Sequence, residues 1–185
     1  MRVLAISGSL RRDSNNTRLL RVAAELAPPP AELELFDGLK DVPPYDEDDD
    51  GDLVPEGAQR LREAIARADA VLIATPEYNS SIPGQLKNAL DWASRPFPDN
   101  VLRNKPVAVI GASTGMFGAV WAQADLRKVL AAIGARVVDR EIPVPTADEI
   151  VRDRDKLESS GTHSLMIGLL AELIGEANQR EELAA

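Results

Sequence analysis

The sequence contains no cysteine and a single histidine, His163. The absence of cysteine excludes disulfides, thiol nucleophiles and thiolate-ligated iron–sulfur or zinc sites. With one histidine, a multi-histidine metal site cannot form within one chain, and a Ser-His-Asp triad would have to use His163. Because His163 precedes the apolar face of a predicted C-terminal helix, we expect it to be a surface residue without a catalytic role.

Excess positive charge and long apolar runs are also missing. The 185 residues carry a formal net charge of −9, which argues against nucleic acid or an anionic membrane as a partner. No apolar run reaches the roughly 20 residues of a membrane-spanning helix, and residues 1–3 lead into a predicted strand rather than a signal peptide. We therefore expect a cytoplasmic protein, and the length favours one domain over residues 1–185.

Apolar runs of strand length alternate with stretches of helical periodicity. The predicted strands cover residues 3–6, 31–36, 69–75, 106–111 and 135–138. Helices are expected between them, and another near the end of the chain, within residues 149–182. The 31–36 run partly alternates with acidic residues, which is typical of an edge strand. The pattern predicts a three-layer α/β sandwich with a five-stranded parallel sheet in the order 2-1-3-4-5 and helices on both faces.

The loop after the first strand, Ser7–Thr17, is rich in groups that bind anions. It leads into a helix, where backbone N–H groups and the positive end of the helix dipole favour negative charge. We predict a phosphate monoester bound by Ser9, Arg11, Ser14, Asn16 and Thr17. The alternative is an ordinary capped helix, which needs one such residue. Neither the P-loop nor the dinucleotide fingerprint is present, which favours a mononucleotide.

Two further loops follow buried strands. The first, Pro76–Ser81, offers an aromatic ring, a carboxylate, an amide and backbone N–H groups at the strand end where α/β sheets bind ligands. Its alternative is a plain connection in which Asn79 or Ser80 caps the next helix. The second, Ala112–Gly118, contains glycines that suggest either close approach to a planar group or a flexible turn. Residues 43–45 could close over one side of the pocket that these loops form.

The motifs GSLRRDSNNT, PEYNSSIPGQLKNALDW and GASTGMFGAVWAQADLR resemble those of the NADPH-dependent FMN reductases, over about residues 1–140. That group has the flavodoxin-like fold and includes quinone, azo-dye and chromate reductases. The resemblance implies FMN with its phosphate in the first loop. It also implies contacts to the isoalloxazine and ribityl chain from Pro76, Glu77, Tyr78 and Asn79, with Ser113 and Gly115 on the far side. The backbone N–H groups of residues 76–80, Ser80 included, would face the flavin N1/O2 edge.

The resemblance also implies the reaction. NADPH or NADH would transfer hydride to FMN, and a small-molecule acceptor (a flavin, a quinone, an azo compound or a metal oxyanion) would then take the electrons in a ping-pong cycle. Because the chemistry belongs to the cofactor, no protein acid or base is required. Arg12 and Arg95 are candidates to bind a 2′-phosphate. Such proteins are homodimers or homotetramers, and Asp91, Trp92 and Arg127 are our interface candidates.

Two other classes of protein are alternatives to a reductase. An electron carrier of the flavodoxin type would fit the acidic charge but would not oxidise NADPH rapidly. A phosphoreceiver domain needs acidic residues at the ends of the first and third strands, where Ser7 and Thr75 stand.

Overall fold

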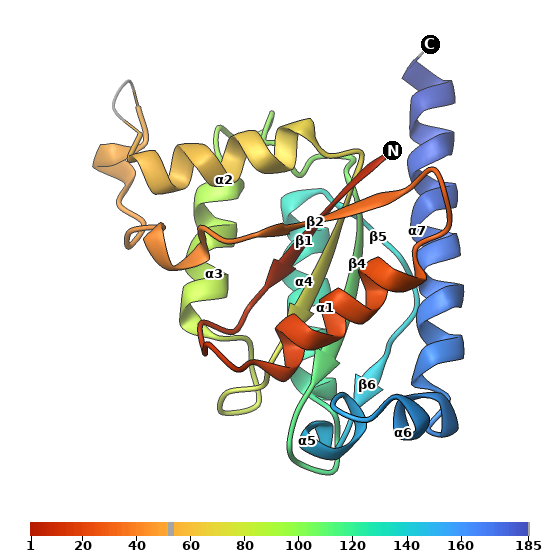
Figure 1. The fold of residues 1–185 in the computed structure, drawn as a ribbon. Coiled ribbons are helices and arrows are strands. Elements are labelled where there is room, and N and C mark those ends of the chain that lie inside the picture. The colour runs from red at the N-terminus through yellow and green to blue at the C-terminus, as the bar shows by residue number, and fades with distance from the viewer. Residues whose placement is uncertain (52–53, 185) are drawn as a thin grey trace.

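The computed structural model describes residues 1–51 and 54–184, and it shows a parallel sheet between two layers of helices (Figure 1). The sheet has the order β2-β1-β3-β4-β5, with β6 also paired to β4. Its strands are β1 (Arg2–Ser7), β2 (Glu32–Phe36), β3 (Ala70–Thr75), β4 (Pro106–Ala112), β5 (Arg136–Val137) and β6 (Pro143–Val144). The predicted sandwich and strand order are confirmed.

The helices are α1 (Asn15–Leu26), α2 (Glu56–Arg67), α3 (Gly84–Ala93), α4 (Val120–Ile133), α5 (Ala147–Ile150), α6 (Arg154–Ser159) and α7 (Thr162–Ala184). Two 3-10 turns, η1 (Leu39–Asp41) and η2 (Glu47–Asp49), lie between β2 and α2. Over the described residues, no helix, α7 included, combines the length and the apolar character needed to cross a membrane.

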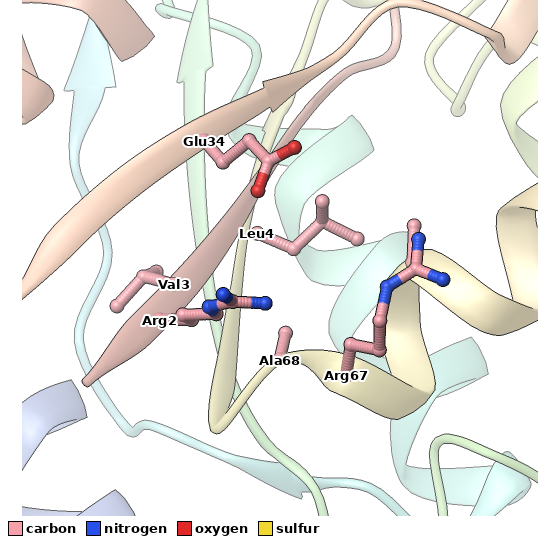
Figure 2. Close-up of a pocket in the computed structure, with 7 residues that line it drawn as sticks. Arg2, Val3, Leu4, Glu34, Arg67 and Ala68 are labelled. Atoms are coloured by element: carbon pink, nitrogen blue, oxygen red, sulfur yellow. The ribbon is translucent and has the colours of Figure 1, made fainter.

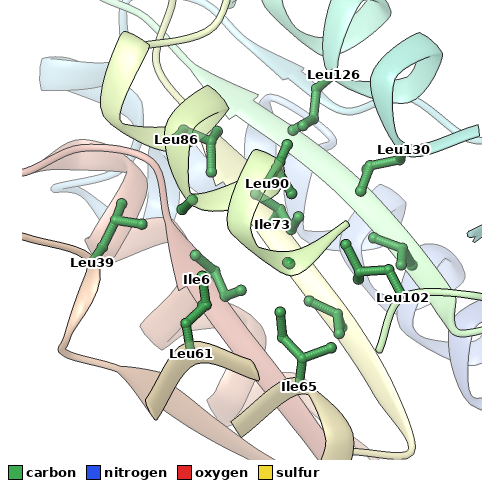
Figure 3. Close-up of a cluster of buried hydrophobic side chains, with 14 of the residues drawn as sticks. Ile6, Leu39, Leu61, Ile65, Ile73, Leu86, Leu90, Leu102, Leu126 and Leu130 are labelled. Carbon is green, nitrogen blue, oxygen red and sulfur yellow. The ribbon is translucent and has the colours of Figure 1, made fainter. Parts of the chain in front are cut away.

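The central strands are buried on both faces, and this explains their unbroken apolar runs. In β3, Val71 and Ile73 pack with α2, α3 and α4, whereas Ala70, Leu72 and Ala74 pack with α1 and α7. Figure 3 shows the first of these two layers, in which Leu61, Ile65, Leu86 and Leu126 surround Ile73. Side chains that alternate between two covered faces leave no polar face, so each strand reads as continuous apolar sequence.

The fifth position of the sheet is divided between two short strands. β5 pairs with the start of β4, and β6 pairs with its end, through Gly111 and Ala112. Between them the chain leaves the sheet, where Arg127 of α4 donates to the carbonyls of Val138 at 2.7 Å and Arg140 at 3.2 Å. The sequence predicted one strand over residues 135–138 and missed β6, because two residues beginning with proline carry no periodic signal.

The connection that follows β2 packs on α3 through Pro43 and Tyr45. The Pro43 carbonyl accepts hydrogen bonds from Asn88 Nδ2 and Trp92 Nε1, and the Tyr45 ring contacts Trp92 edge-on with centroids 4.9 Å apart. Residues 43–45 are not among the residues that line the pocket described below, and their closure over a ligand stays a prediction. Trp92 is fully buried, which removes it as an interface candidate.

Candidate functional site

Three loops at the carboxyl edge of the sheet enclose a pocket of about 590 Å³ that is open to solvent. These loops follow β1, β3 and β4, which are neighbours in the sheet. The lining residues are Ser9, Arg11, Ser14, Asn15, Asn16, Pro76, Glu77, Tyr78, Ala112, Ser113 and Thr114. Of the site residues predicted from the sequence, Thr17, Asn79, Ser80 and Gly115 lie outside this lining, and the prediction omitted Asn15, Ala112 and Thr114.

Several polar side chains of the first loop are already bonded to the protein. Ser14 caps α1 by accepting a hydrogen bond from the Thr17 N–H at 3.3 Å, and Thr17 Oγ1 donates to Ser7 Oγ at 2.8 Å. The buried Asn16 amide donates to the Ala112 carbonyl at 2.9 Å and accepts from the Ala112 N–H at 3.0 Å. Asn16 and Thr17 therefore hold this loop against β4 and β1.

Charge at the first loop is distributed unequally among its arginines. Asp13 accepts hydrogen bonds from Arg18 at 2.6 Å and Arg152 at 2.8 Å, and these bonds lower the pKa of Asp13 to about 2. Arg11, in contrast, has no carboxylate partner among residues 1–51 and 54–180. Since Arg11 lines the pocket, it is a cation available to an anionic ligand.

Asn15 is a lining residue with an incomplete set of hydrogen bonds. Its Nδ2 donates to Asp148 Oδ1 at 2.8 Å, while its Oδ1 is buried and has no partner within the described part of the chain. A buried acceptor without a partner costs on the order of 1–3 kcal/mol. A ligand that brings a donor to this end of the pocket would recover that free energy.

The loop after β3 is a tight hairpin rather than a helix cap. Tyr78 and Ser81 exchange two backbone hydrogen bonds, and Asn79 and Ser80 take the left-handed conformations, with φ of 54° and 61°, that a two-residue turn requires. Neither residue caps α3, whose N-cap position is Pro83. The Tyr78 N–H is consumed in the hairpin and is unavailable to a flavin, whereas the Tyr78 ring is 54% exposed.

Glu77 is held by the start of a neighbouring helix. One of its carboxylate oxygens accepts the backbone N–H groups of Trp121 at 3.1 Å and Ala122 at 3.2 Å. These are orphan donors in the first turn of α4, so Glu77 supplies the cap that α4 lacks from its own N-cap residue, Ala119. Ser81 reinforces the same junction through a hydrogen bond to Asp125.

The loop after β4 is bonded to the segment that follows β6. The Ser113 carbonyl accepts from the Ala147 N–H at 3.0 Å, and the Gly115 carbonyl accepts from the Thr146 N–H at 3.1 Å. Gly118 has a φ of +57°, and a Cβ added there would lie 2.5 Å from the Val144 nitrogen. Gly118 is therefore required by its close approach to β6 and not by a planar ligand.

The two basic residues considered for a 2′-phosphate lie in different places. Arg12 is exposed on the first loop. Arg95 lies beyond the last turn of α3, where its Nε donates to Tyr45 Oη at 3.1 Å. That end of α3 is remote from the loop that precedes the helix, so Arg95 is not part of the pocket.

A smaller pocket of about 300 Å³ lies at the opposite, amino-terminal edge of the sheet (Figure 2). Arg2, Glu34 and Arg67 are arranged around it, with Leu4 and Ala68 between them. Arg67 pairs with Glu63 at 3.5 Å, and the backbone N–H of Arg2 donates to Asp69 at 2.7 Å. The larger pocket lies at the carboxyl ends of the strands, where open α/β sheets bind ligands, and it is therefore the better candidate for function.

The fold and the pocket define a class. An open parallel α/β sheet with a polar pocket at the carboxyl ends of β1, β3 and β4, where the strand order reverses, is the arrangement of a nucleotide- or flavin-binding protein. Arg11 and Glu77 are the charged groups among the lining residues, and Glu77 is bonded to α4.

Comparison with known proteins identifies the family. A family model described as NADPH-dependent FMN reductase matches residues 1–149, and the chain belongs to this family. It is 49% identical over 130 residues to a NAD(P)H-dependent FMN reductase of Pseudomonas aeruginosa, covering 70% of this chain and 69% of that protein. It is 47% identical over 131 residues to a 2-hydroxy-1,4-benzoquinone reductase of a Burkholderia species, covering 71% and 70%.

A solved structure agrees in fold and in length. The flavoenzyme NAD(P)H:(acceptor) oxidoreductase FerB of Paracoccus denitrificans superimposes with a TM-score of 0.82 at 36% identity, covering 96% of this chain and 97% of that one. The chain is thus a NAD(P)H-dependent FMN or quinone reductase with FMN as its cofactor and the flavodoxin-like fold.

The residues present fit this cofactor. The N-terminus of α1, the unpaired Arg11 guanidinium and the hydroxyls of Ser9 and Ser14 form a donor set suited to a phosphate. The unpartnered Asn15 Oδ1 suits a hydroxyl donor, which the ribityl chain carries.

Proposed function

We propose that the chain oxidises NAD(P)H through bound FMN and passes the electrons to a quinone. The observation that carries this proposal is the composition of the pocket: it offers an arginine without a carboxylate partner in the described part of the chain, which suits a phosphate, and its carboxylate is already bonded to a helix. Bound FMN supplies the hydride and electron chemistry, so the chain needs to hold and orient it. Relatives named quinone reductases, one of them from Escherichia coli at 39% identity, support the choice of acceptor.

The proposed contacts divide between the two ends of the pocket. Ser9, Arg11, Ser14 and the first N–H groups of α1 bind the phosphate. Pro76, Glu77 and Tyr78 face Ser113 across the rest of the pocket and bind the flavin. Asn79, Ser80 and Gly115 act through their backbone. Asn79 and Ser80 form the hairpin turn that shapes the loop after β3, and the Gly115 carbonyl joins the loop after β4 to Thr146.

The first experiment is a visible spectrum of the purified protein under nitrogen, before and after one equivalent of NADPH. Flavin bands that bleach and then return on addition of benzoquinone would agree with the proposal. Bands that persist after NADPH would contradict it in favour of an electron carrier. The same titration with free flavin, an azo dye and chromate ranks the other acceptors.

The proposed kinetic mechanism is ping-pong, because one pocket serves both substrates. Reduced nicotinamide and quinone would occupy the same place in turn, so each must leave before the other binds. Initial rates at several fixed quinone concentrations should give parallel double-reciprocal lines against NADPH. Intersecting lines would show that both substrates bind together and would exclude this mechanism.

A homo-oligomer is also proposed, on the basis of an apolar rim beside the pocket. Met116, Phe117 and Trp121 are 77%, 57% and 47% exposed, and the Phe117 and Trp121 rings contact each other with centroids 4.9 Å apart. Exposed apolar patches of this kind mark interaction sites. Phe117→Ser should shift the mass measured by light scattering toward the monomer, whereas Phe97→Ser, at a more exposed phenylalanine outside the rim, should not.

The proposed compartment is the cytoplasm. The dependence of the family on NAD(P)H supports it, since that co-substrate is supplied there.

A further inference from the structure

The segment that follows β6 contacts two of the three loops that form the pocket. In Figure 1, β6, α5 and α6 lie along the edge at which β4 ends. Backbone bonds from Thr146 and Ala147 hold the loop after β4, as described above. Side chains of the same segment reach the first loop: Asp148 accepts from Asn15 Nδ2, and Arg152 donates to Asp13.

These two side chains form one unit. Asp148 and Arg152 are four residues apart, and the Arg152 guanidinium lies 3.7 Å from Asp148 Oδ1. Their partners Asn15 and Asp13 stand on either side of Ser14, the N-cap of α1. Asn15 is the first residue of the helix whose N-terminus faces the proposed phosphate. The hydrogen bond to Asp148 fixes the orientation of the Asn15 amide, and it therefore decides whether the oxygen or the nitrogen of that amide faces the pocket.

We propose that Asp148 and Arg152 are positioning residues for the phosphate end of the cofactor site, acting through Asn15 and Asp13. The inference rests on the proposed placement of the phosphate at Ser9, Arg11 and Ser14. Asp148 orients the Asn15 amide, and Arg152 holds Asp13 so that Arg11 stays directed to the ligand and not to this carboxylate. Neither residue lines the pocket.

Charge arithmetic supports a positioning role over a binding role. Arg152 lies between the carboxylates of Asp13 and Asp148, so its charge is compensated before any ligand arrives. Arg18 also pairs with Asp13, so the Asp13 carboxylate accepts hydrogen bonds from two arginines. Removing Arg152 would free one face of Asp13, and the nearest cations along the loop are Arg12, next to Asp13, and Arg11, two residues away, of which Arg11 lines the pocket.

The chain offers a matched control for each residue. Glu149 is next to Asp148 on α5 and pairs with Lys156 at 3.5 Å, away from the loops. Arg154 is two residues beyond Arg152 and pairs with Glu158 at 3.5 Å. The variants Asp148→Ala and Arg152→Gln are therefore compared with Glu149→Ala and Arg154→Gln.

The readout is the ratio of the dissociation constants of FMN and riboflavin for the deflavinated protein, measured by quenching of flavin fluorescence, together with the apoprotein Tm. A positioning role predicts roughly five-fold weaker FMN binding in each variant, riboflavin binding changed less than about two-fold, and a Tm equal to that of its control. The conservative variants Asp148→Asn, which keeps an acceptor for Asn15, and Arg152→Lys should retain most of the wild-type affinity for FMN.

Equal weakening of both flavins with a lower Tm would overturn the proposal, because it would show a structural role only. Should Asp148→Ala fail to fold, Arg152→Gln and the two conservative variants decide the question. Arg11→Ala separates the two levels of inference. If Arg11→Ala lowers the preference for FMN while Arg152→Gln and Asp148→Ala do not, positioning is wrong and the phosphate placement stands. If Arg11→Ala leaves the preference unchanged, the placement itself is wrong.

Discussion

Lys105 at the amino edge of the sheet and Arg11 at its carboxyl edge differ in whether the protein itself supplies a partner for the charge. At the amino edge, the buried Lys105 donates to the carbonyls of Ala66 and Ala68 at the end of α2, so a costly charge is used to satisfy the backbone. At the carboxyl edge, Arg11 has no carboxylate partner and Asn15 Oδ1 has no donor within the described chain. Groups left unpaired where loops converge indicate a place prepared for a ligand, whereas a buried ammonium group bonded to backbone carbonyls indicates a structural role.

Asn16→Ala should have the largest effect. Asn16 lies at the carboxyl edge, yet both polar atoms of its amide have protein partners, so this substitution tests whether all polar groups at that edge serve a ligand. Asn16→Ala leaves both the N–H and the carbonyl of Ala112 without partners in a buried position. We expect a loss of about 3 kcal/mol in the free energy of unfolding, measured by urea denaturation of the apoprotein. A loss below about 1 kcal/mol would mean that Asn16 belongs with the ligand-binding groups.

Arg11→Ala should instead weaken FMN binding without changing the stability of the apoprotein. The guanidinium makes no ion pair with the described residues, so the stability of the apoprotein should be unchanged. A charge-assisted bond to phosphate is worth about 1.5–3 kcal/mol, which predicts FMN binding weakened by roughly 30-fold. Arg154→Ala, at an exposed arginine outside the pocket, is the control. Destabilisation with unchanged FMN affinity would break the comparison between the edges.

Lys105→Met tests the amino edge through pH. Burial, with a smaller contribution from Arg180, lowers the pKa of Lys105 from 10.5 to about 8. Between these values the unfolded chain binds more protons than the folded one, so the stability contribution of Lys105 is lowest below pH 8 and rises toward pH 10.5. The free energy of unfolding of the wild type minus that of Lys105→Met should therefore increase by about 2 kcal/mol between pH 8 and pH 10. A flat difference would mean that water reaches the ammonium group.

The sequence predicted the layers and strand order because each central strand is apolar on both faces and each helix has a periodic stripe. It located the pocket for a similar reason: the carboxyl ends of neighbouring parallel strands must meet. What it missed depends on contacts between distant segments. β6 is a strand because Gly111 and Ala112 pair with it, and nothing in residues 143–144 alone indicates that.

The roles of individual site residues were harder to predict for the same physical reason. Asn15 and Asn16 are adjacent and identical in type, yet one bonds to Asp148 and the other to Ala112. Glu77 was expected at the flavin, and its bonds to the first turn of α4 follow from how two loops pack. Residue type and position indicate that a polar group is present, but the partner it finds is decided by the tertiary structure.

The smallest expected effect is at His163, which belongs to neither edge. It lines a separate crevice with Val22 and Leu26 of α1 and Leu157 of α6. Histidine is the side chain whose charge ordinarily changes between pH 5 and 8, so it is the natural suspect for any activity change in that range. If the pocket works without a protein acid or base, His163→Ala should leave the rate of NADPH oxidation, the FMN affinity and the profile of activity between pH 6 and 8 unchanged. An inflection in the wild-type profile that disappears in the variant would require a proton path from the α1–α7 face to the pocket, and the carboxyl edge could then no longer be treated as self-contained.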